Sequence, residues 1–151
     1  MKLRLAFLII IAFIITACAP ASNDLASAIQ VGNPWVRTVN TTEGMGGSTT
    51  ALFMKLQNNT DTPDMLLEAE SDIADMVQIH LSEIDANGVS SMHEVQGVEI
   101  PANGSVELKP GSYHIMVMGL KQMIKEGDTV TFSLTFQKAG TITVEAPVKA
   151  P

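Results

Sequence analysis

The chain has 151 residues, a formal net charge of −7 at pH 7 and a single cysteine. An acidic chain argues against nucleic acid as a partner and against a basic membrane-binding surface. A single cysteine excludes a disulfide within the chain, so a packed core must stabilise the fold. The length suits one domain with a core of its own.

The N-terminal segment has the pattern of a bacterial lipoprotein signal. Lys2 and Arg4 are followed by an apolar run over residues 5–15, which is too short to span a bilayer as a mature helix. Residues 15–18 read Ile-Thr-Ala-Cys and resemble the lipobox, in which the cysteine is lipidated and becomes the mature N-terminus. We expect a signal peptide over 1–17, lipidation of Cys18 and a tether over 18–28. An ordinary signal peptide or an uncleaved anchor is the alternative.

The remaining sequence predicts a single all-β domain. Short apolar runs are separated by turn residues such as Asn87-Gly88 and Pro110-Gly111, and no long helical period is present. The number of runs suits a β-sandwich or a small Greek-key barrel. Strands are expected at 29–36, 50–58, 65–69, 76–84, 89–95, 105–108, 112–118, 129–136 and 141–148.

The strand expected at 112–118 carries residues that could bind a metal. Since side chains alternate along a strand, His114 and Met116 share a face and lie about 7 Å apart. Imidazole and thioether are donors that a soft ion such as Cu(I) prefers. His80 and Met92 also fall on the more polar face of their strands. These four residues are therefore candidates for one copper site.

The loop that joins the strands at 76–84 and 89–95 decides whether His80 and Met92 share a face. A two-residue type I′ turn at Asn87-Gly88 would place them on opposite faces. A three-residue loop over 86–88, with Gly88 in the left-handed bulge position, shifts the pairing by one residue and places them on the same face. The copper hypothesis therefore predicts the bulged turn.

The spacing of these residues resembles that of the periplasmic copper chaperone family PCu(A)C. Eleven residues separate His80 from Met92, twenty-one separate Met92 from His114, and His114 and Met116 form a His-x-Met motif. The sequences around these positions are also similar to the family, at 35–37, 98–104, 107–111, 114–120, 125–130 and 139–140. Leu81 stands where many members have a second methionine, and by strand phase it faces the core.

The resemblance implies a cupredoxin-like domain over 29–148 that carries copper and is not an enzyme. It implies Cu(I) as the cargo, with Cu(II) left open, and delivery to extracytoplasmic acceptors such as the CuA centre of cytochrome oxidase subunit II and Sco-type proteins. We expect a monomer, anchored by lipid to a bacterial membrane, in the periplasm or on the outer face of the cytoplasmic membrane.

Several alternatives accompany this interpretation. A β-sandwich lipoprotein with a structural or ligand-binding role would leave the histidines and methionines incidental. A blue-copper centre is disfavoured because it needs a cysteine ligand, and no catalytic motif stands out. Met118 is the best candidate for an auxiliary thioether. Met45 is a weaker one, and His93 has the opposite phase to Met92 and is expected not to bind.

Overall fold

The computed structural model describes residues 28–39 and 48–150. The expected signal peptide, Cys18, most of the tether and Met45 lie outside these residues. Every regular element in the described residues is a strand. These residues contain no helix long and apolar enough to cross a membrane. The strands are β1 (Ile29–Arg37), β2 (Thr49–Asn58), β3 (Asp64–Glu70), β4 (Ala74–Ile84), β5 (Ser90–Glu94), β6 (Val98–Ile100), β7 (Ser105–Leu108), β8 (Tyr113–Leu120), β9 (Thr129–Phe136) and β10 (Gly140–Lys149).

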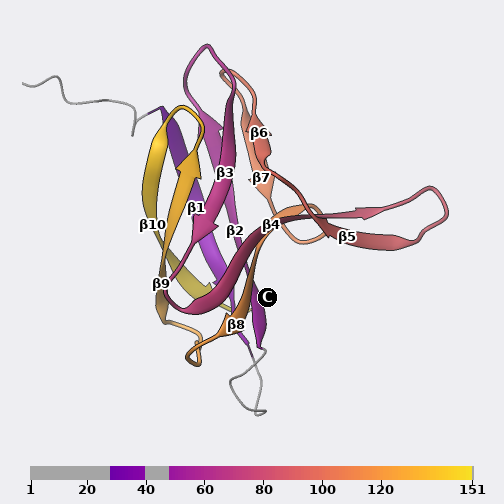
Figure 1. Ribbon diagram of the computed structural model, residues 1–151, viewed down its shortest axis with the longest axis vertical. Helices are drawn as coiled ribbons and strands as arrows, with labels where there is room; N and C mark the ends of the chain where they lie inside the picture. The colour runs from indigo at the N-terminus through magenta and orange to yellow at the C-terminus, as the bar shows by residue number, and fades with distance from the viewer. Residues whose placement is uncertain (1–27, 40–47, 151) are drawn as a thin grey trace, which may run out of the picture.

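These strands form a cupredoxin-like β-sandwich, as the sequence predicts (Figure 1). The neighbouring strands run in the order β5-β4-β8-β2-β1-β10-β9-β3-β6, and β7 pairs with β2. The first five strands make one layer and the last four make the other. The layers join through β1 and β10, which pair in parallel, with Val36 opposite Val148, whereas all other pairs are antiparallel.

The core between the layers fixes which face of each strand points outward. Ile115 and Val117 on β8 are fully buried, as are Phe132 and Leu134 on β9. Burying a side chain of this size stabilises the fold by about 1.5–3 kcal/mol. Because side chains alternate along a strand, this burial turns the intervening residues of β8 toward the other face of its layer. A shift by one residue would bury the polar set in place of the apolar one.

Two buried polar side chains, Asn58 and Asp64, bind the backbone of loops at one end of the sandwich. The Asn58 amide donates to the carbonyl oxygens of Thr62 (2.8 Å) and Ile100 (3.3 Å). The Asp64 carboxylate accepts from the backbone amides of Lys138 (2.9 Å) and Ala139 (3.0 Å). Each satisfies backbone groups that would otherwise be buried without partners.

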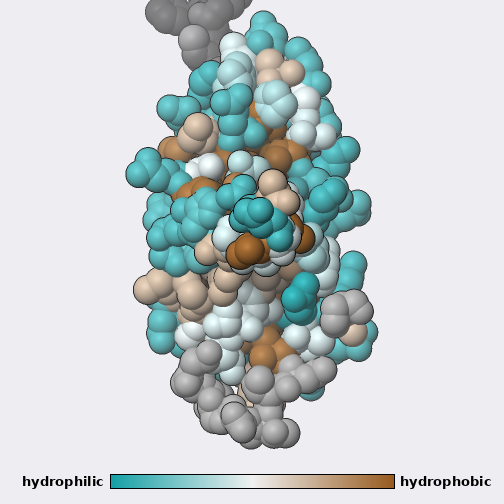
Figure 2. Space-filling view, turned by 90° about the vertical axis from the view of Figure 1, so that its right-hand side faces the viewer, coloured by the Kyte–Doolittle hydropathy of each residue, from teal (hydrophilic) through white to brown (hydrophobic). Residues whose placement is uncertain are grey.

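The sequence prediction missed one strand, β6 (Val98–Ile100), which pairs with β3. A strand of three residues is too short for its alternation to stand out in the sequence. The hairpin of β4 and β5 projects from the body of the sandwich (Figure 1). Figure 2 views this side and shows hydrophobic surface in the middle of a largely hydrophilic face; near the loop of the hairpin, Ile84 and Val89 are both exposed.

Candidate metal centre

The β4–β5 hairpin turns through a three-residue loop, as the copper hypothesis requires. The amide of Asp85 donates to the carbonyl of Val89 (3.0 Å), and that of Gly88 donates back to Asp85 (3.0 Å). Gly88 has a φ of 80°, the left-handed conformation of a bulge. Ser82 is consequently paired with Met92. His80 and Met92 therefore lie on the same face of the sheet.

The carboxylate of Asp85 holds this loop in shape. It accepts hydrogen bonds from the backbone amides of Val89 (2.8 Å) and Asn87 (2.8 Å). The bond from Val89 is the largest cause that lowers the pKa of Asp85 below its usual range. The loop therefore depends on two residues with distinct roles, a glycine that supplies the conformation and an aspartate that binds its amides.

The pairing of β4 with β8 arranges the candidate ligands in rows across the sheet. His80 is opposite His114. In the next row, Gln78 is opposite Met116. Met92 lies on β5 in the row on the other side of His80. Two imidazoles thus occupy a central row, with one thioether in each flanking row. Side chains in neighbouring rows are within reach of one another.

In its neutral form, each imidazole keeps one ring nitrogen without a proton. The ring centroids of His80 and His114 are 6.0 Å apart. Nδ1–H of His114 donates to the carbonyl of Ser112 (2.9 Å), which leaves the lone pair on Nε2. Nε2–H of His80 donates to the Gln78 side-chain oxygen (3.1 Å), which leaves the lone pair on Nδ1. That Nδ1 is buried and has no hydrogen-bond partner.

The surroundings of His80 favour its neutral form. Burial lowers the pKa of His80 below 6.5, and His114 lowers it further, while Glu94 opposes them. Glu94 is paired with His80 across the hairpin. Because a metal binds the neutral imidazole, this ring is ready to act as a ligand at neutral pH.

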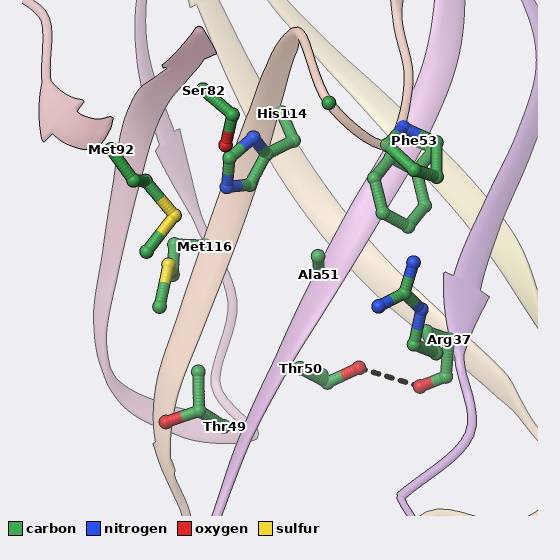
Figure 3. A pocket seen from close by; sticks show the side chains of 11 residues that line it. Arg37, Thr49, Thr50, Ala51, Phe53, Ser82, Met92, His114 and Met116 are labelled. Atoms are coloured by element: carbon green, nitrogen blue, oxygen red, sulfur yellow. Dashed lines mark hydrogen bonds between the residues drawn. The ribbon is translucent and has the colours of Figure 1, made fainter. Parts of the chain in front are cut away.

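An open pocket of about 280 Å³ lies at His114. Met92, His114 and Met116 line it, together with Ser82, Phe53 and Arg37. In Figure 3 the sulfur atoms of Met92 and Met116 lie on the same side of the pocket, with the His114 ring next to them. His80 is not part of the lining, and lies on β4 next to His114.

The expected surface site is only partly exposed. Met92 is 50% exposed, but only 6% of His114 is accessible. Phe53 is a neighbour of the buried His114, with 6.4 Å between the ring centroids. The Trp35 ring lies 4.6 Å from the Phe53 ring, between centroids, and the Arg37 guanidinium lies 5.3 Å from the Phe53 ring centroid. The strand phase of His114 is as predicted, whereas its burial among neighbouring rings is not.

Sequence reasoning missed the groups that orient the imidazoles. Gln78 shares the strand phase of His80, so its position could have been predicted, although its hydrogen bond could not. The Ser112 carbonyl is a backbone group, and no side chain signals its role. His93 pairs with Leu81 and lies on the opposite face from Met92, as expected.

Methionines supply the remaining candidate donors beside the two histidines. Within residues 28–39 and 48–150, no group of three or more His, Cys, Asp or Glu side chains could hold a metal ion. A metal that binds beside His80 and His114 must therefore complete its coordination with thioethers, water or a partner. Thioether donors select soft ions such as Cu(I).

Known proteins similar to this chain fall into two groups. The LpqE-like family of lipoproteins matches residues 29–148. A relative from Leifsonia xyli subsp. xyli, which is named as a lipoprotein, Lxx21020, is 33% identical over 143 residues, or 89% of this chain and 82% of the relative.

The second group consists of solved structures. The copper-bound PCuAC domain from PmoF2 has a TM-score of 0.67 and 28% identity, covering 82% of this chain and 94% of that domain. The solution structure of CuI-DR1885 from Deinococcus radiodurans has a TM-score of 0.60 and 29% identity, with 85% of both chains covered. The chain belongs to the LpqE-like family, and its β-domain is of the PCuAC type.

Proposed function

We propose that this protein is an extracytoplasmic copper chaperone that holds Cu(I) through His80, Met92, His114 and Met116. The observation that carries the proposal is the pair of facing imidazoles, each with a free lone pair, flanked by a thioether on either side. The similarity to a copper-bound PCuAC domain supports it. Copper is the cargo, and the protein acts as a carrier and not as an enzyme.

The donor set explains why Cu(I) would be the form carried. Two neutral imidazoles and two neutral thioethers suit a soft ion and can surround it in a near-tetrahedral arrangement. Neither donor is a thiol, so the site cannot be lost to disulfide formation outside the cytoplasm. A zinc site would more often use cysteine or several carboxylate and histidine ligands.

The exposure of the ligands favours delivery over storage. His114 is buried and held by Ser112, whereas Met92 is half exposed on an edge strand. An acceptor could replace Met92 first and draw the ion away one ligand at a time. The CuA centre of cytochrome oxidase subunit II and Sco-type proteins are the acceptors we propose, on the strength of the family resemblance.

We also propose that Cys18 is lipidated after removal of residues 1–17, so that 18–28 tether the domain at 29–148 to a membrane. The lipoprotein names of the family and of the Leifsonia relative support this. Cys18→Ser should release the protein from the membrane fraction and abolish incorporation of labelled palmitate. Retention of label in Cys18→Ser would refute the assignment.

An anaerobic titration against a chromogenic Cu(I) chelator tests the copper site. The protein purified in detergent should bind one ion tightly at the proposed site, and His114→Ala with Met116→Ala should abolish that binding. Two control variants remove the same chemistry elsewhere: His93→Ala on the other face of β5, and Met123→Ala at a position 72% exposed. Both should bind as the wild type does.

The variants separate the proposal from its alternative. Unchanged tight binding in the double variant would refute the assignment of the ligands. A folded wild type that fails to compete for Cu(I) would favour a β-sandwich lipoprotein in which these residues are incidental.

A further inference from the structure

A fourth row of side chains continues the metal-binding face beyond the proposed site. Met76 on β4 is directly opposite Met118 on β8, in the row next to the Gln78–Met116 pair. The Cβ atoms of such a pair are about 4.5–5.5 Å apart, so two long thioether side chains can meet. The proposed copper site makes no use of either residue.

Packing does not explain why methionine occupies these positions. Met76 is 53% exposed and shares the outward strand phase of Gln78 and His80. Large apolar side chains on such a face gain little from burial. Met118 is half-buried, and its neighbour on β2 is Thr49. Two thioether side chains therefore start from paired positions on the outward face of the sheet.

Met116 lies between this pair and the histidines. It precedes Met118 by two residues on the same face of β8, about 7 Å along the strand. Its neighbour on β2 is Ala51, whose small side chain leaves room on that side. One thioether can therefore reach an ion held by the histidines or an ion held by Met76 and Met118.

We propose that Met76 and Met118, with Met116 as a shared third donor, form a second site for Cu(I) on this face. The inference rests on the proposed function, since Met116 belongs to both sites. Three neutral thioethers select a soft monovalent ion. Without an imidazole the second site binds more weakly than the first. The ion moves between the sites with no change in oxidation state, by exchange of one donor at a time.

This arrangement gives copper a route along the sheet. His114 is covered, whereas Met76 is the most exposed of the sulfur donors on β4 and β8. A metal ion passing through Met116 to Met76 and Met118 would reach the surface without leaving coordination by sulfur. A partner with soft donors of its own could then take the ion from Met76.

Titration with Ag(I), a redox-inert probe for Cu(I), tests the second site. In the full chain, with methionine methyl groups labelled with ¹³C, the first equivalent should shift the resonances of Met92 and Met116. Further equivalents should shift those of Met76 and Met118. Met76→Leu with Met118→Leu, which nearly conserves volume, should lose the second step and keep the first. Met123→Leu should keep both steps.

A second variant makes the outcome independent of the proposed function. In His80→Ala with Met92→Ala, the first step should be lost while Met76 and Met118 still shift. If Met92 and Met116 shift in the wild type but Met76 and Met118 do not, the second site is refuted and the proposed function stands. If Met76 and Met118 shift while Met92 and the histidine rings do not, the second site survives and the proposed function fails.

Discussion

The bulged turn gives a sharp test of how the β4–β5 hairpin is held. Gly88 has a φ of 80°, and a Cβ added there would meet nothing within 4 Å. Gly88→Ala would therefore add no clash and would introduce only the cost of a left-handed backbone, about 1–2 kcal/mol. Since about 1.4 kcal/mol is a tenfold change in an equilibrium constant, the hairpin should open about 5- to 30-fold more often.

Native-state hydrogen exchange measures this opening. The amide of Asp85 is bonded to Val89, and that of Val95 is bonded to Ile79, so both report on the hairpin. Their protection factors should fall about 5- to 30-fold in Gly88→Ala. Gly88→Asn should change them far less, because asparagine tolerates the left-handed region better.

A matched control comes from Gly127, which has a φ of 92° and also has nothing within 4 Å of an added Cβ. Gly127→Ala carries the same strain in the loop before β9. Gly127→Ala should leave unchanged the protection factors of hairpin amides that exchange by local opening. It should lower the protection factors only of amides that exchange by global unfolding. Unchanged protection of Asp85 and Val95 in Gly88→Ala would refute the assigned role of this turn.

Three further predictions concern stability and pH. Asn58→Ala should destabilise the fold by about 1–3 kcal/mol, because it leaves buried carbonyls unpaired. Asp64→Ala should lower the free energy of unfolding by about 1.5–3 kcal/mol or more, since a charged acceptor of several amides is lost. Urea denaturation measures the stability of both variants. Neither residue lines the pocket, so a large loss of Cu(I) affinity in either folded variant would contradict the assigned site. Because the pKa of His80 is lowered, this ring should cause no change in Cu(I) affinity between pH 8 and 6.5. Below pH 6.5 the affinity should fall as the ring gains a proton. A steady decline between pH 8 and 7 that His80→Ala removes would contradict this.

Strand phase and turn chemistry account for what could be predicted from the sequence. The phase of Ile115 and Val117 placed His114 and Met116 together, and the glycine at position 88 made the bulged turn a testable alternative. Both follow from local rules, the alternation of side chains and the left-handed conformation that glycine permits.

What could not be predicted depends on contacts between distant parts of the chain. Phe53 on β2 lies near the buried His114, and it is brought beside β8 only by the sheet order. The pairing of His80 with His114 also follows from the register of β4 and β8. The sequence predicted four ligand candidates, whereas the tautomers of the rings depend on Gln78 and on a backbone carbonyl.

The hydrogen bonds that orient the two imidazoles have a consequence for the energetics of transfer. In its neutral form each ring already holds its proton on the nitrogen that donates to Gln78 or to the Ser112 carbonyl, and a thioether has no proton to lose. When both rings are neutral, Cu(I) would therefore enter and leave without releasing or taking up protons. Exchange with an acceptor of similar ligands would then be independent of the proton gradient across the membrane. Its direction would depend only on the number and softness of the donors that each protein offers.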